Sequence, residues 1–107
     1  LRGPADLDGT AGAYDGVNLK LMKCGGLGEA AAIAGAARRK GLKLMIGCMI
    51  ESSVGISAAA QLAPLADVLD LDGCLLIGND PYRGAVAADG TVTLSDEPGI
   101  GVSEARS

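Results

Sequence analysis

The chain has 107 residues, the length of one small domain, and its 9 Lys and Arg against 13 Asp and Glu give a net charge of −4. This balance, with no basic stripe in the sequence, argues against a nucleic-acid partner. No apolar run approaches the ~20 residues that a membrane-spanning helix needs. Hydrophobic residues make up 49% of the chain without any Phe or Trp, so the core must consist of small and aliphatic side chains.

Three cysteines and the absence of histidine narrow the possible chemistry. Cys24, Cys48 and Cys74 are odd in number and lack CxxC spacing, which predicts free thiols in a cytoplasmic protein. A zinc site is not expected without histidine. The sequence starts at Leu1 with no signal-peptide pattern, and an Ala-rich core stabilises a short chain only weakly. We therefore expect a fragment that depends on a larger body for its stability.

The first half of the chain alternates helical and extended patterns. Residues 4–14 are weakly compatible with a helix that two glycines interrupt, and residues 17–22 form an apolar strand candidate. An Ala-rich helix is predicted over residues 27–40, because it ends in basic residues followed by glycine. A second strand is predicted over residues 43–48.

The same alternation continues in the second half. A helix is predicted over residues 55–63, with Ser52 or Ser53 as its N-cap, and a third strand over residues 67–72. Strands that alternate with helices of this length predict parallel βαβ units. Three parallel strands cannot close a barrel, and an open sheet would expose two edges. The pattern therefore favours a slice of a (β/α)₈-type barrel.

The C-terminal part of the chain has a different pattern. Residues 85–87 and 91–94 flank Asp89-Gly90, a dipeptide typical of a tight β-hairpin turn. The tail from Asp96 onward is interrupted by Gly and Pro, and we expect it to be irregular.

Lys20 is the first candidate functional residue. In the predicted strand it shares a face with Asn18 and Met22, while the opposite face is apolar and should meet the helices. A lysine inside a barrel is costly unless it is used, and the carboxyl ends of barrel strands carry active sites. The alternative is a surface lysine on an edge strand.

An acidic pair marks the end of the third strand. Asp70 and Asp72 share one face, so their carboxylates repel each other unless they meet water or a cation. That cation could be a metal or the ammonium group of a substrate. The alternative is that one of them caps the following turn.

Two more charged residues lie near the same end of the sheet. Glu51 follows the second strand, so it should converge with Lys20, Asp70 and Asp72 on one rim. It could instead be an acidic residue that complements the dipole of the next helix. For Lys23 a solvated loop lysine is the favoured interpretation.

Three segments, residues 18–27, 45–56 and 70–73, resemble consecutive barrel-strand motifs of dipeptide epimerases of the enolase superfamily, which include L-Ala-D/L-Glu epimerases. Residues 98–102 resemble the usual ending of these proteins, and the resemblance covers about residues 4–102. It implies an α/β fold, the C-terminal part of an enolase-superfamily (β/α)₇β barrel with its last three strands and a C-terminal hairpin.

The resemblance implies a division of the chain. Residues 1–84 would be the C-terminal part of the catalytic barrel. Residues 85–107 would be a hairpin and tail that return toward a missing capping domain.

The resemblance also implies roles for the candidate residues. Lys20 would be one of two acid/base lysines that flank the substrate α-carbon in a 1,1-proton transfer. Asp70 and Asp72 would hold the ammonium group of the dipeptide substrate. The residues that would line the substrate pocket are Cys48, Met49 and Ile50, and the possible rim residues are Glu51 and Lys23.

The rest of the machinery would lie upstream of Leu1. The second lysine and the Mg²⁺ ligands are expected there, so the fragment should hold no metal ligand and be inactive alone. The parent protein would be an isomerase, and homo-oligomerisation stays open. One alternative is another racemase or cycloisomerase of the superfamily, such as an N-acylamino acid racemase, o-succinylbenzoate synthase or muconate cycloisomerase. The acidic pair argues against these, because their substrates carry no free ammonium. The other alternative is a non-catalytic barrel fragment.

Overall fold

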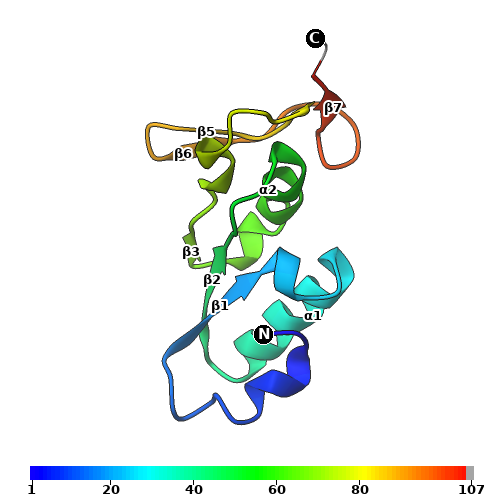
Figure 1. Cartoon of the computed structure of the whole chain (residues 1–107). Helices are drawn as coiled ribbons and strands as arrows, with labels where there is room; N and C mark the ends of the chain where they lie inside the picture. The colour runs from blue at the N-terminus through cyan, green and yellow to red at the C-terminus, as the bar shows by residue number, and fades with distance from the viewer. Residues whose placement is uncertain (106–107) are drawn as a thin grey trace.

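Three parallel strands form the sheet in the computed structural model, which describes residues 1–105 (Figure 1). They are β1 (Gly16–Lys20), β2 (Lys43–Gly47) and β3 (Val68–Leu69), in the order β1-β2-β3. Lys20 lies opposite Gly47, and Ile46 lies opposite Leu69. This register aligns the carboxyl ends of the strands, which is where the predicted functional residues lie.

Two helices cover one side of the sheet, as the alternation predicted. These are α1 (Leu27–Arg39) and α2 (Ser53–Ala60), and Figure 1 shows both on the same side of the strands. Leu19, Leu44 and Ile46 are fully buried against them, while Asn18 on the other face is exposed. The core is built from Leu, Ile and Ala, so close packing of small residues replaces large aromatic side chains.

Several elements are shorter than the sequence predicts. The first strand ends at Lys20 and continues as the 3₁₀ helix η2 (Leu21–Lys23), and the second ends at Gly47. The third covers only Val68–Leu69, because the chain turns into the 3₁₀ helix η4 (Gly73–Leu76). The backbone N–H of Asp70 still donates to the carbonyl of Ile46 at 2.9 Å, so the residues after β3 stay alongside β2.

The N-terminal segment and the link after α2 contain only short 3₁₀ helices. The predicted helix over residues 4–14 is reduced to η1 (Pro4–Leu7), followed by turns. Helix α2 ends at Ala60, earlier than predicted, and η3 (Ala63–Leu65) precedes β3. None of the helices among residues 1–105 is long and apolar enough to span a bilayer.

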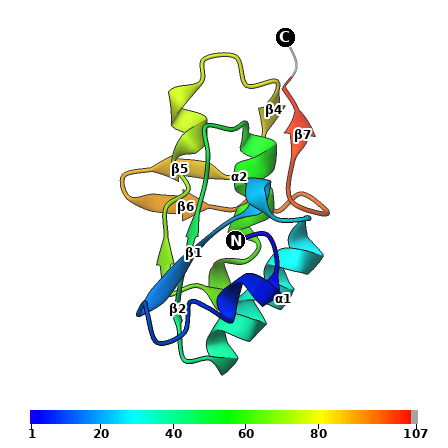
Figure 2. The ribbon, with the colours of Figure 1, turned by 60° about the horizontal axis from the view of Figure 1, so that its bottom comes forward.

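The C-terminal hairpin is confirmed, and the tail from Asp96 to Val102 is irregular as expected, but the two-residue strand β7 (Ser103–Glu104) then follows. Strands β5 (Val86–Ala88) and β6 (Thr91–Thr93) pair antiparallel, and Asp89 and Gly90 at the turn both have positive φ. Strand β7 pairs with β4 (Tyr82–Arg83) across the end of α2 (Figure 2). Two-residue strands carry almost no local pattern, so the sequence did not reveal this pairing.

The N-terminus of α2 is capped from a distance. Ser52 is the N-cap residue, as one of the two predicted alternatives, but its side chain makes no capping hydrogen bond. Instead, an oxygen of Asp80 accepts the backbone N–H of Ser53 at 2.7 Å. Burial raises the pKa of Asp80, but the hydrogen bonds from Ser53 and Tyr82 outweigh it and hold that pKa below its usual value. The charged carboxylate therefore ties the segment after η4 to the start of α2.

Candidate active site

A shallow pocket of about 290 Å³ opens at the carboxyl end of the sheet. Its walls come from the end of β1, the loop after β2 and the segment after β3. Six residues predicted from the sequence line this pocket, together with Gly73 and Leu76; the six are Lys20, Cys48, Met49, Ile50, Asp70 and Asp72. The parallel register explains why residues far apart in the sequence meet here.

Lys20 enters the pocket from the last position of β1. Its side chain is half-buried, and its Nζ donates a hydrogen bond to the carbonyl oxygen of Cys48 at 3.0 Å. The preceding residue, Leu19, points to the helices and is fully buried, so strand alternation directs Lys20 to the other face. The amine is therefore held at the pocket by a neutral acceptor.

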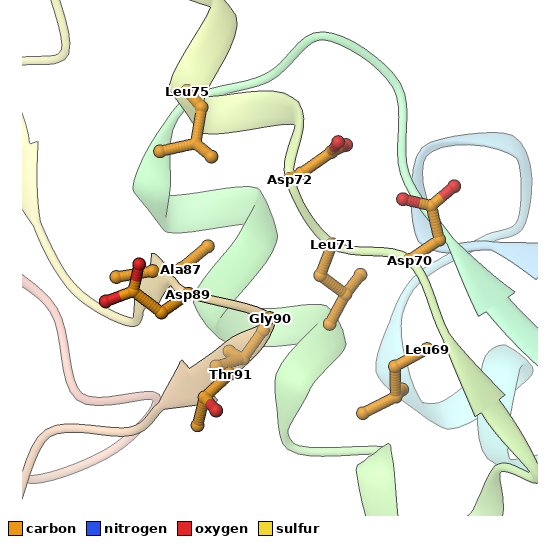
Figure 3. Close-up of a pocket in the computed structure, with 11 residues that line it drawn as sticks. Leu69, Asp70, Leu71, Asp72, Leu75, Ala87, Asp89, Gly90 and Thr91 are labelled. Carbon is orange, nitrogen blue, oxygen red and sulfur yellow. The ribbon is translucent and has the colours of Figure 1, made fainter.

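Asp70 and Asp72 form the acidic part of the pocket. Both are exposed, and their carboxylates project to one side of the chain while Leu69 and Leu71 project to the other (Figure 3). Neither carboxylate forms a salt bridge with any residue in the range 1–105. The pair therefore favours a cation at this place.

These acidic residues do not fit a magnesium site. One potential ligand atom from each of Cys48, Asp70 and Asp72 lies within 4.8 Å of the other two, and the Sγ of Cys48 is 4.0 Å from Asp72 Oδ1. Mg²⁺ prefers an octahedron of oxygen ligands, and a thiol does not supply one. An ammonium group fits better, because it needs only hydrogen-bond acceptors around it.

Gly73 is a pocket residue that the sequence did not single out. A Cβ at this position would collide with the carbonyl oxygen of Met49 and would lie 3.1 Å from the Sγ of Cys48. The segment after β3 thus packs directly on the loop after β2. The only signal in the sequence is that glycine follows the acidic pair immediately.

Two predicted rim residues lie outside the lining of this pocket. Lys23 is exposed on η2. Glu51 turns back onto its own loop, where Oε2 accepts the backbone N–H of Met49 at 3.0 Å. Of the four charged residues expected to converge, Lys20, Asp70 and Asp72 meet at the pocket.

A second pocket of about 340 Å³ lies between the segment after β3 and the hairpin tip, as Figure 3 shows. Asp70 and Asp72 also border this pocket, but Lys20 does not. Nearby, burial raises the pKa of the Cys74 thiol, and the carboxylates of Asp80 and Asp72 add to that shift. Cys74 is therefore a protonated thiol at neutral pH rather than a nucleophile.

Comparisons with known proteins agree with this geometry. Residues 9–106 match the family model described as enolase C-terminal domain-like. An L-Ala-D/L-Glu epimerase of Bacteroides thetaiotaomicron is 48% identical over 97 residues, which are 91% of this chain and 25% of the relative. A hydrophobic dipeptide epimerase of Roseobacter litoralis is 54% identical over 89 residues, which are 83% of this chain and 26% of the relative. The chain thus spans about a quarter of the length of these curated relatives.

Solved structures are similar as well. The dipeptide epimerase from Methylococcus capsulatus, complexed with Mg ion, superposes with a TM-score of 0.88 at 40% identity, covering 98% of this chain and 32% of that one. The substrate-liganded L-Ala-D/L-Glu epimerase from Bacillus subtilis superposes with a TM-score of 0.85 at 30% identity, covering 95% of this chain and 30% of that one. An N-succinyl Arg/Lys racemase from Bacillus cereus superposes with a TM-score of 0.89 at 30% identity, covering 98% of this chain and 30% of that one.

Proposed function

This chain belongs to the enolase C-terminal domain-like family, and from that premise we propose that it supplies part of the active site of a dipeptide epimerase. One observation carries the proposal: the amine of Lys20 shares a pocket with Asp70 and Asp72, whose carboxylates have no salt-bridge partner among residues 1–105. A dipeptide has an α-proton next to its carboxylate and a free ammonium one residue away. The pocket offers a partner for each.

Lys20 is proposed to exchange the α-proton of the dipeptide's C-terminal residue on one face. In its neutral form the amine accepts the proton from carbon, and in its charged form it returns one. Inversion requires a second acid/base group on the opposite face, which we place outside this chain. The Mg²⁺ that accompanies similar structures is also assigned to ligands outside this chain, because the acidic group here does not suit it.

Asp70 and Asp72 are proposed to select substrates with a free amino terminus. A dipeptide ammonium donates hydrogen bonds to both carboxylates and neutralises part of their charge. An N-acylated amino acid cannot do this, so it would leave two carboxylates desolvated without a partner. The acidic pair therefore favours a dipeptide over the N-succinyl substrates named for one similar structure.

Isotope exchange tests the proposed function directly. The whole protein is incubated in D₂O with Mg²⁺ and a panel that contains L-Ala-L-Glu, other dipeptides and N-succinyl-arginine, and α-deuterium is followed by NMR. We expect deuterium in at least one dipeptide and none in the acylated amino acid. Absence of deuterium from every dipeptide would refute the epimerase proposal.

Replacing the amine tests the role of Lys20. Lys20→Ala should slow exchange from the face that Lys20 serves by at least about 10²-fold, which is the usual contribution of a general acid or base. Exchange from the opposite face should continue, because the other acid/base group is intact. Lys23→Ala is the matched control, since that lysine is exposed outside the pocket lining. Equal exchange from both faces in Lys20→Ala would remove Lys20 from the reaction.

A further inference from the structure

Glu51 has an unusual position for a charged residue so near the pocket. Its Oε2 accepts the backbone N–H of Met49, two residues back along the chain. Its Oε1 is buried and has no hydrogen-bond partner among residues 1–105. That oxygen lies against the Cα of Gly55 in α2, where any Cβ would collide with it. The carboxylate is therefore packed between its own loop and the helix.

The peptide group that Glu51 binds is the one that holds Lys20. The N–H of Met49 and the carbonyl of Cys48 are the two ends of one planar peptide unit. Glu51 accepts from its N–H at 3.0 Å, and Lys20 Nζ donates to its carbonyl oxygen at 3.0 Å. Because the unit is rigid and trans, fixing the direction of the N–H also fixes the direction of the carbonyl.

Little else holds this loop in place. The side chains of Met49 and Ile50 are exposed, at 44% and 68%, so apolar packing does not determine the loop conformation. The carbonyl of Met49 and the Sγ of Cys48 also lie against Gly73, which blocks movement toward the segment after β3. Polar contacts to the peptide unit therefore determine its orientation.

We propose that Glu51 is a positioning residue for Lys20, and that it acts through the Cys48–Met49 peptide group. The inference rests on the proposed function only in what Lys20 does; the hydrogen-bonded chain stands without it. A carboxylate on the N–H also polarises the amide and makes its carbonyl a stronger acceptor, because hydrogen bonds in series reinforce each other. The amine is thus held at one place at the pocket edge.

Gly55 contributes to the same arrangement of contacts. It lies inside α2, where alanine is a better helix former than glycine. The absence of a side chain leaves the space in which Oε1 of Glu51 sits. Gly55→Ala should therefore displace the carboxylate while the helix itself is favoured, which separates positioning from stability.

Three variants of the whole protein test the proposal by dipeptide exchange in D₂O. Glu51→Ala should slow exchange from the Lys20 face by about tenfold, equivalent to one lost hydrogen bond, with KM and opposite-face exchange nearly unchanged. Glu51→Gln should keep most of the rate, because its amide oxygen still accepts the Met49 N–H. Gly55→Ala should reproduce Glu51→Ala. Glu97→Ala, an exposed residue of the C-terminal tail, is the control.

A measurement without substrate separates this proposal from the proposed function. Lys20 is acylated with a small active ester and the rate is followed by peptide mass spectrometry. In Glu51→Ala and Gly55→Ala the rate should change severalfold from wild type, and in Glu51→Gln it should not. If these acylation rates are all equal, the positioning role is wrong. It is also wrong if Glu51→Ala slows deuterium exchange equally from both faces of the α-carbon. A wild-type protein inactive on every dipeptide but with the expected labelling pattern would refute the epimerase alone.

Discussion

The carboxylates of Asp70 and Asp72 have no salt-bridge partner in the described part of the chain, and both line the pocket that Lys20 also lines. Their mutual repulsion is relieved only by solvent or by a bound cation. Under the proposed function, the ammonium group of a dipeptide would supply one positive charge for the pair. The two residues would then make substrate binding depend on a particular functional group rather than on the size of the ligand.

Asp72→Asn should weaken the use of dipeptides by the whole protein. Losing one charged hydrogen-bond partner corresponds to about 1.5–3 kcal/mol, or about a 10- to 100-fold lower kcat/KM. Initial rates with L-Ala-L-Glu and with another dipeptide check this expectation. Asp89→Asn on the hairpin is the matched control, since that carboxylate is exposed and lies outside the Lys20 pocket. An unchanged kcat/KM in Asp72→Asn would exclude ammonium recognition by this residue.

Gly73→Ala should disrupt the pocket where the segment after β3 packs on the loop after β2. The new Cβ would collide with the backbone carbonyl of Met49, which cannot move as a flexible side chain could. We expect the free energy of unfolding of the whole protein to fall by about 1–3 kcal/mol, typical of overpacking, with loss of exchange activity. Gly78→Ala is the control, because nothing lies within 4 Å of a Cβ there. Denaturant titration of both variants measures the difference.

For single residues, the sequence predicted which face of a strand a side chain occupies better than it predicted the hydrogen bonds of that side chain. Strand alternation correctly placed Lys20 on the face away from the helices, and it placed Asp70 and Asp72 together. The hydrogen bond from Lys20 to Cys48 depends on the conformation of a loop 28 residues further along, which no local pattern specifies. The position of Glu51 was missed although its contact is local, because its carboxylate binds the backbone N–H of Met49 in its own loop instead of pointing into the pocket.

Among the elements, the junction between β2 and β3 depends on one carboxylate. Asp67 precedes β3; its Oδ2 accepts the backbone N–H of Leu44 at 2.8 Å and lies 2.9 Å from Arg38 NH1 on α1. The hydrogen bond from Leu44 and then the Arg38 guanidinium lower the pKa of Asp67. One side chain therefore links a helix to two strands.

The pH dependence of stability should report this carboxylate. A pKa lowered in the folded state contributes stability above the unfolded value, about 3.9. This contribution is lost as the pH falls through the lower folded value. Asp67→Asn in the whole protein should thus flatten the dependence of stability on pH below about 4. Melting temperatures between neutral and acidic pH measure this, and a slope equal to that of wild type would contradict it.

The elements that were predicted well share a strong local signal. Helix α1 has an Ala-rich pattern with basic residues in its last turn, and it ends within one residue of the prediction. The hairpin has the Asp-Gly turn. The third strand was predicted too long, because the alternation in the sequence continues through residues 70–72 although β3 ends at Leu69.

For the whole molecule, the predicted fold class is confirmed by the family match and by the solved structures that superpose on nearly all of the chain. The chain nevertheless exposes more surface than a compact body of its mass. Its accessible surface is 6401 Å², against roughly 5,500 Å² expected for 10.6 kDa. Its radius of gyration is 14.3 Å, against roughly 13 Å expected for this length.

The isolated chain should therefore fold poorly. Large apolar side chains are exposed along β3 and the hairpin, including Val68 at 55% and Val86 at 59%. We expect a broad thermal transition and binding of a hydrophobic dye, both absent from the whole protein. Calorimetry decides: a single sharp transition of about 60–80 kcal/mol, typical of a domain of this size, would show that the chain folds independently.

The pairing of β4 with β7 also bears on how the protein folds while it is being synthesised. As the chain leaves the ribosome, Tyr82–Arg83 emerges well before its partner Ser103–Glu104. Until then β4 has no partner strand, although the carbonyl of Tyr82 accepts the hydroxyl of Ser53 at the start of α2. A nascent chain arrested after Arg83 and before Ser103 would therefore hold the start of α2 through Asp80 and Tyr82 but lack the β4–β7 pairing beside it.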